Sequence, residues 1–97
     1  MIHSFHDPGT EDIFNRRDSA QARRTCPASL WAVARRKLDM LDAAVSLTSL
    51  RAPPGNALGA SKGGRSGQHS IRINDQFRVC VVWKADGPAD AAIVDYH

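Results

Sequence analysis

The chain has 97 residues, of which 42% are hydrophobic and 24% are charged, and its formal net charge is +3. This composition excludes an intrinsically disordered chain, and no apolar run approaches the roughly 18 residues that span a bilayer. A chain of this length has room for one hydrophobic core, so we expect a single domain over residues 1–97 with one functional site.

The N-terminal residues carry no pattern of an export signal. Met1–Asp7 lacks the basic and the apolar segments of a secretory leader, so we expect a cytoplasmic protein without membrane association. A reducing compartment disfavours disulfides. We therefore expect Cys26 and Cys80 to be free thiols that pack as small hydrophobic side chains.

The N-terminal quarter predicts a strand and a short helix. Ile2–Phe5 alternates apolar and polar residues and predicts a first strand, after which Pro8-Gly9 predicts a turn. The helix should begin at Thr10, whose hydroxyl can cap it, and end near Arg17. The segment Asp18–Thr25 is polar and shows no periodicity.

A longer amphipathic helix should follow, with Pro27 in its first turn. Apolar residues then recur at spacings of four and three, which predicts a helix of about sixteen residues with one buried face. The residues of that face are Leu30, Ala34, Leu38, Leu41 and Val45. Leu47 and Leu50 predict one more turn, and Pro53-Pro54-Gly55 should end all helical structure.

Two strands with alternating apolar residues should form a hairpin. A three-residue loop, Asn74–Gln76, would pair Ile73 with Phe77, Ile71 with Val79 and His69 with Val81, and all these side chains would share one face. A two-residue loop would set an isoleucine opposite an arginine.

The same register predicts that Ser70, Arg72 and Arg78 lie together on the opposite face. After a loop at residues 85–88, Ala91–His97 should form the last strand. The predicted fold class is α+β, with two principal helices packed on one face of a small antiparallel sheet.

Positive charge is concentrated in one part of the sequence. Residues 62–78 contain four basic residues and one acidic residue, whereas residues 1–50 contain seven basic and six acidic residues. The four basic residues are Lys62, Arg65, Arg72 and Arg78. Isolated surface cations are usually only solvated, but this density on a glycine-rich loop and a hairpin indicates phosphate binding.

Several motifs in chain order resemble the HigB-type killer toxins of the RelE/ParE superfamily. The motifs are residues 34–44 (ARRKLDMLDAA), 50–56 (LRAPPGN), 67–80 (GQHSIRINDQFRVC) and 93–97 (IVDYH). The resemblance implies the toxin of a type II toxin–antitoxin module, which cleaves mRNA on the translating ribosome. It also implies a helix-turn-helix antitoxin of the HigA type as partner, with operator DNA bound only through the antitoxin complex.

Cleavage of RNA without a metal ion requires a base at the 2′ oxygen, cations at the developing phosphorane and an acid at the leaving 5′ oxygen. The residues and the resemblance together give catalytic candidates: Lys62, Arg65, Arg78, Asp95, Tyr96 and His97. The RNA-binding candidates are Arg72, His69 and Gln68. We expect no cofactor and no metal. His3 and His6, for example, would project to opposite faces of a strand.

Some of these residues have structural alternatives. Tyr96 is equally explained as a half-buried residue of an edge strand, and His69 as a packed core histidine. Asp95 is also explained as the ion-pair partner of an arginine.

The chain departs from the family pattern after Asn56. Family members have an arginine where this chain has Ala57, and a histidine or glutamate of the active site where it has Gly59. The loss of a general base costs about 10²- to 10⁴-fold in rate. The alternatives are therefore an attenuated toxin, a degenerate copy, an engineered inactive form, and a non-enzymatic homologue that still binds the antitoxin. A ParE-like gyrase inhibitor is less favoured, because the hairpin and the terminal motif resemble HigB.

Overall fold

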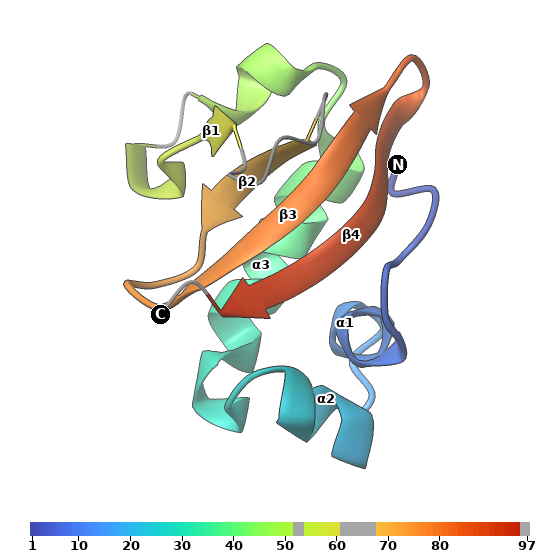
Figure 1. The fold of residues 1–97 in the computed structure, drawn as a ribbon, viewed down its shortest axis with the longest axis vertical. Coiled ribbons are helices and arrows are strands. Elements are labelled where there is room, and N and C mark those ends of the chain that lie inside the picture. The colour runs from blue at the N-terminus through green and yellow to red at the C-terminus, as the bar shows by residue number, and fades with distance from the viewer. Residues whose placement is uncertain (52–53, 61–67, 96–97) are drawn as a thin grey trace.

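The computed structural model describes residues 1–51, 54–60 and 68–95, which form an α+β fold (Figure 1). Its four-stranded antiparallel sheet has the order β1 (Gly59–Ala60), β2 (Gln68–Arg72), β3 (Phe77–Lys84) and β4 (Gly87–Asp95). In the view of Figure 1 the longest helix, α3 (Trp31–Ala43), lies behind the sheet. Two shorter helices, α1 (Pro8–Phe14) and α2 (Ala20–Thr25), lie at the lower end. The predicted fold class is confirmed.

Helix α1 begins two residues earlier than predicted, because Asp7 and not Thr10 caps it. The Asp7 carboxylate accepts a hydrogen bond from the Thr10 N–H at 2.7 Å, and Pro8 occupies the first turn, where its missing N–H costs nothing. The predicted turn at Pro8-Gly9 and the predicted Thr10 cap are therefore wrong. The buried Thr10 hydroxyl instead accepts from the Ile93 N–H at 3.0 Å, which fastens α1 to β4.

Helix α2 lies in the segment that the sequence pattern left irregular. Ser19 caps it by accepting from the Ala22 N–H at 3.0 Å, and Ala22 is fully buried. A Cβ atom on Gly9 of α1 would lie 1.8 Å from Thr25 Oγ1, so the absence of that atom permits the close approach of the two helices. A six-residue helix with one fully buried position is too short to show helical periodicity, and the prediction failed for this reason.

The buried face of α3 agrees with the predicted spacing only in its middle. Ala34, Leu38 and Leu41 are buried as predicted. Val45 is 94% exposed, because the helix ends at Ala43 and the extended backbone of Ala44 turns the chain away. The helix therefore has 13 residues and is preceded by a separate 3-10 turn, η1 (Ala28–Leu30).

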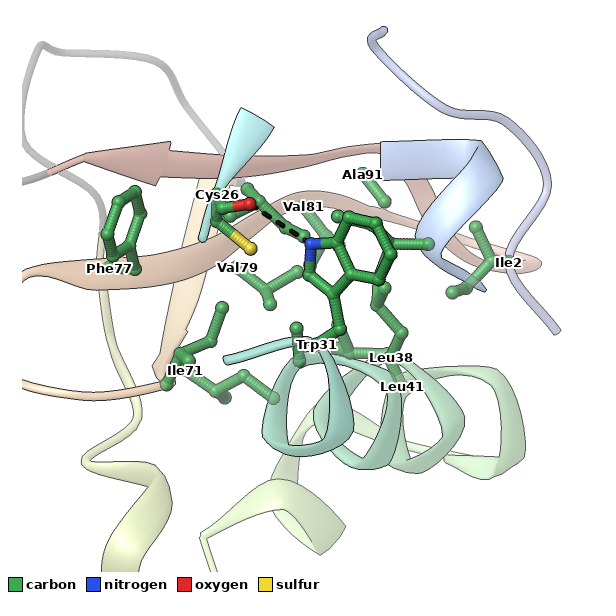
Figure 2. Packing of buried hydrophobic residues seen from close by; sticks show 14 of the residues in the cluster. Ile2, Cys26, Trp31, Leu38, Leu41, Ile71, Phe77, Val79, Val81 and Ala91 are labelled. Atoms are coloured by element: carbon green, nitrogen blue, oxygen red, sulfur yellow. Dashed lines mark hydrogen bonds between the residues drawn. The ribbon is translucent and has the colours of Figure 1, made fainter. Parts of the chain in front are cut away.

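Trp31 connects the start of α3 to the core. Figure 2 shows its indole ring between the helix and the strands, near Val79 and Val81. Its Nε1–H donates to the carbonyl oxygen of Cys26 at 3.0 Å. Cys26 and Cys80 are both buried thiols outside any disulfide, as predicted. The core lies between α3 and one face of the sheet.

After α3 the chain makes two short 3-10 turns. The predicted turn through Leu47 and Leu50 is confirmed as η2 (Leu47–Leu50). The prediction that helical structure ends at Pro53-Pro54-Gly55 is wrong, because the 3-10 turn η3 (Pro54–Asn56) begins at the second proline. Proline has no N–H to donate, but the first position of a turn needs none. This second turn precedes β1 in the chain.

The hairpin has the predicted register. Ile71 pairs with Val79, His69 with Val81 and Arg72 with Arg78. The Ile73 N–H donates to the Phe77 carbonyl at 3.0 Å, which closes the three-residue loop. Side-chain sorting between two faces was therefore sufficient to predict this pairing.

Strand β4 is longer than predicted, and the N-terminal segment is less regular. β4 begins at Gly87, directly after a tight turn, and not at Ala91. The predicted strand over Ile2–Phe5 is reduced to a single parallel bridge between Phe5 and Ala91. None of the described helices is long and apolar enough to cross a membrane.

Candidate active site on the outer face of the sheet

The face of the sheet opposite α3, called the outer face below, carries the polar residues of the hairpin. Gly59 pairs with Ser70, and Ser70 pairs with Cys80. Two residues further along β2, Arg72 pairs with Arg78. Directly paired residues of antiparallel strands project to the same face. The structure therefore brings position 59 of β1 to the same face as the two arginines.

Hydrogen bonds to two described neighbours, Ser70 and Ala57, hold Arg78 in place. Its Nε donates to the Ser70 hydroxyl at 2.8 Å. One terminal nitrogen donates to the Ala57 carbonyl at 2.6 Å and to the Ser70 carbonyl at 3.5 Å. The guanidinium group thus reaches across β2 to the segment before β1. A cation that is already ordered loses less conformational entropy when an anion binds.

The backbone of Ala57, which accepts this bond, is in the left-handed region with φ of 45°. A residue with a Cβ atom adopts this conformation at a cost of about 1–2 kcal/mol, and the surrounding contacts must hold it there. The bond from Arg78 is one such contact. Strain of this kind is typical of functional sites.

Arg72 is the second outer-face cation, and it forms an ion pair with Asp75 in the hairpin loop. Its side chain is 43% exposed. An ion pair at this exposure is weak, so an RNA phosphate can compete for the guanidinium group. Gln68 lies on the same face, opposite Val82, and is half-buried.

His69 lies on the other face. It pairs with Val81 and shares the helix-covered side with Ile71 and Val79. Its partial burial there supports the packed alternative over a role in RNA binding.

Asp95 ends β4 at the edge of the site. It pairs with Phe77, whereas Arg78 pairs with Val94, so the alternation along the strands directs Asp95 and Arg78 to opposite faces. The exposed carboxylate accepts a hydrogen bond from the Gln76 side chain at 3.0 Å. The structure therefore does not place Asp95 beside Arg78. Four further candidates, Lys62, Arg65, Tyr96 and His97, lie outside the described residues.

The described residues leave room for a side chain at position 59. Among the described residues, the nearest atom to a Cβ built on Gly59 is the Ala57 carbonyl oxygen, at 4.0 Å. The described residues therefore do not require a glycine at this position.

The sequence patterns missed a buried polar pair behind the site. Lys37 of α3 is 6% exposed and donates to Asn56 Oδ1 at 2.5 Å, while Asn56 Nδ2 donates to the Leu50 carbonyl at 3.0 Å. Burial, and then the neighbouring charges of Arg36 and Arg72, lower the pKa of Lys37. One signal was present in the sequence, because a spacing of three from Ala34 places Lys37 on the buried side of the helix.

Within residues 1–51, 54–60 and 68–95 no three His, Cys, Asp or Glu side chains are grouped in a way that would hold a metal ion.

Comparison with known proteins identifies the family. Residues 3–97 match the family of RelE-like toxins of the type II toxin–antitoxin system HigB. The chain belongs to the HigB-like toxin family. It is 35% identical over 97 residues to toxin HigB-1 of Vibrio cholerae serotype O1, covering 100% of this chain and 98% of that protein. It is also 38% identical over 58 residues to an uncharacterized protein of Haemophilus influenzae, covering 60% of this chain and 55% of that protein.

Membership of the HigB-like family gives the protein its biological role. This protein is the toxin of a type II toxin–antitoxin system, and such a toxin has an antitoxin partner. RelE-like toxins of this kind are generally endoribonucleases, which agrees with cations gathered on one face of the sheet.

Proposed function

We propose that this HigB-like toxin is a ribosome-dependent endoribonuclease that cleaves mRNA and so inhibits translation. The observation that carries the proposal is the arrangement of Arg78, which is ordered by Ser70 and Ala57 on the same face as Arg72. RNA phosphates need such cations, and an ordered arginine fork matches the geometry of phosphate oxygens.

The proposed reaction is attack of a ribose 2′-hydroxyl on the adjacent phosphate. A base takes the proton of the 2′-hydroxyl, a bond forms between the 2′ oxygen and phosphorus, the bond to the 5′ oxygen breaks, and that oxygen takes a proton from an acid. Arg78, together with Lys62 and Arg65, would stabilise the additional negative charge of the phosphorane. Arg72 and Gln68 would bind the neighbouring RNA.

Proton transfer is assigned to His97, with Tyr96 as a surface on which a base stacks. Asp95, whose side chain is directed to the face opposite Arg78, receives no proton-transfer role in this proposal. The outer face has no side chain at position 59 to assist His97. RNA binding depends on charge and position, whereas cleavage also requires a proton acceptor. We therefore expect RNA binding to be retained and cleavage to be slow.

The second candidate function is antitoxin binding without catalysis, and Gly59 favours it. Among the described residues, the nearest atom to a Cβ on Gly59 is the Ala57 carbonyl oxygen at 4.0 Å, so these residues do not themselves require a glycine there. On this alternative, the scaffold serves only to bind the antitoxin and to form the repressor complex on operator DNA.

A cleavage assay on ribosomes programmed with mRNA tests the two functions. The Gly59→Glu/Ala57→Arg double variant should cleave about 10²- to 10⁴-fold faster than the natural chain. Gly59→Ala, which fills the same space without a carboxylate, is the matched control and should not accelerate cleavage. Full activity of the natural chain would show that position 59 is not catalytic. No cleavage by either protein would favour the binding function.

We also propose that the chain is one domain that acts in the cytoplasm, and that its antitoxin is a HigA-type helix-turn-helix protein. Co-expression with the product of the adjacent gene should yield a complex that binds operator DNA. If no complex co-purifies, the assignment of the antitoxin is wrong.

A further inference from the structure

The buried pair of Lys37 and Asn56 connects α3 to the outer face. Asn56 is fully buried and immediately precedes Ala57, whose carbonyl accepts the hydrogen bond from Arg78. Asn56 is fastened twice, by accepting from Lys37 and by donating to the Leu50 carbonyl. The acceptor for Arg78 thus belongs to a peptide segment with a fixed anchor one residue away.

A buried lysine with a neutral partner is a costly way to hold a loop. Its charge lies near two further cations, Arg36 and Arg72, and a carboxylate would compensate it better than an amide does. Apolar residues at both positions 37 and 56 would avoid this cost. The pair is therefore better explained by what it orients than by stability alone.

The segment that it orients is strained. Ala57 is held with φ of 45° between Asn56 on one side and the bond from Arg78 on the other. Such a conformation persists only where the surroundings determine it more than once. If the Asn56 anchor is lost, the strain at Ala57 can relax, and its carbonyl then moves away from Arg78.

We propose that Lys37 and Asn56 are positioning residues for Arg78. The Lys37–Asn56 hydrogen bond fixes the peptide that presents the Ala57 carbonyl, and this carbonyl holds the guanidinium group over the outer face. The relevance of this pair to RNA rests on the proposed function, whereas the positioning itself does not.

Nuclear magnetic resonance of the arginine Nε–H groups tests the positioning directly. Arg78 Nε–H donates to Ser70, and Arg35 Nε–H donates to the Ile13 carbonyl at 3.0 Å, away from the outer face. In the Lys37→Met variant the guanidinium group should lose its bond to the Ala57 carbonyl, so its bond from Nε–H to Ser70 should open more often. The rate of hydrogen exchange with water at Arg78 Nε–H should therefore rise about fivefold or more, the factor that corresponds to one lost hydrogen bond. The Arg35 rate should stay unchanged.

The exposed neighbour Arg36 provides the matched control. Arg36→Met also removes a cation from α3, but that cation lies outside the chain of contacts, so neither exchange rate should change. Unchanged exchange at Arg78 in Lys37→Met would overturn the proposal. So would an equal rise at Arg78 and Arg35, because a general loss of stability would affect both groups.

A second variant keeps the test decisive if Lys37→Met does not fold. Lys37→Met/Asn56→Leu replaces both members of the pair with apolar residues, so neither partner is left buried and unsatisfied. It should fold and still show fast exchange at Arg78, and slow exchange there would overturn the proposal.

Binding of a short single-stranded RNA tests whether Lys37 affects RNA affinity through Arg78. Lys37→Met should weaken binding in the natural background but have no further effect in an Arg78→Ala background. Equal losses of affinity in both backgrounds would contradict an action through Arg78. If the natural chain binds no free RNA, the exchange measurements still decide the positioning, and the cleavage assay on ribosomes decides the proposed function.

Discussion

Arg78 and Ala57 are 21 residues apart in the sequence, yet a guanidinium nitrogen of Arg78 donates to the Ala57 carbonyl at 2.6 Å. The bond spans from β3 over β2 to the segment before β1. It couples a cation of the outer face to the segment that leads into position 59. Arg78 is for this reason the first residue to test.

We expect Arg78→Ala to weaken binding of single-stranded RNA and to reduce the slope of log affinity against log salt concentration by about 1, because one phosphate contact is lost. Arg78→Lys keeps the charge but cannot form the same fork of hydrogen bonds. It should keep the salt slope while binding more weakly. Titrations at several salt concentrations measure both quantities. An unchanged slope in Arg78→Ala would remove Arg78 from the RNA site.

Thr10 should stabilise the fold through its hydroxyl group. Thr10→Val keeps the shape but leaves the Ile93 N–H buried without its acceptor, so the free energy of unfolding should fall by about 1–3 kcal/mol. Thr10→Ser retains the hydroxyl and should lose less. Urea denaturation compares the two variants. If Thr10→Val were as stable as Thr10→Ser, the hydroxyl would have no such role.

Gly9 should be required at the contact between α1 and α2. A Cβ atom there would lie 2.6 Å from the Gln21 carbonyl oxygen as well as against the Thr25 hydroxyl, so the helices must move apart. Gly9→Ala should lower the free energy of unfolding by about 1–3 kcal/mol. Gly55→Ala is the matched control, since no described atom lies within 4 Å of its Cβ, and its effect should be small. Thermal denaturation that ranks the two variants equally would contradict this packing.

Cys26 should make the fold sensitive to alkaline pH. Burial raises the pKa of its thiol from 9.0 to about 11, so the folded chain keeps a proton that the unfolded chain loses. The stability that this thiol contributes is complete below pH 9 and is lost as the pH rises to about 11, by about 2–3 kcal/mol in total.

The measurement is the free energy of unfolding against pH for the natural chain and for Cys26→Ala. The difference between the two proteins should fall between pH 9 and about 11 and be constant at lower pH. Taking the difference removes the opposite contribution of Lys37, whose pKa is lowered. A difference that does not change with pH would show that the thiol is not buried as described.

The sequence by itself determined the hairpin and the middle of α3. Ile71, Val79 and Leu38 are on the core side because alternation with period two and spacings of three and four each allow only one buried face. The gathering of Arg72 and Arg78 on the outer face followed from the same sorting. These features repeat along the chain, so a local pattern is sufficient to predict them.

Only the tertiary structure decided the features that depend on single contacts. Helix α2 exists because Ser19 caps it and Gly9 lets it approach α1, and neither contact leaves a period in the sequence. The Lys37–Asn56 pair joins residues 19 positions apart, and the Arg78–Ala57 bond joins β3 to the segment before β1, across the intervening strand β2. A sequence pattern records which face a residue occupies. It does not record which atom of another element that face will meet, because this depends on how the elements pack together.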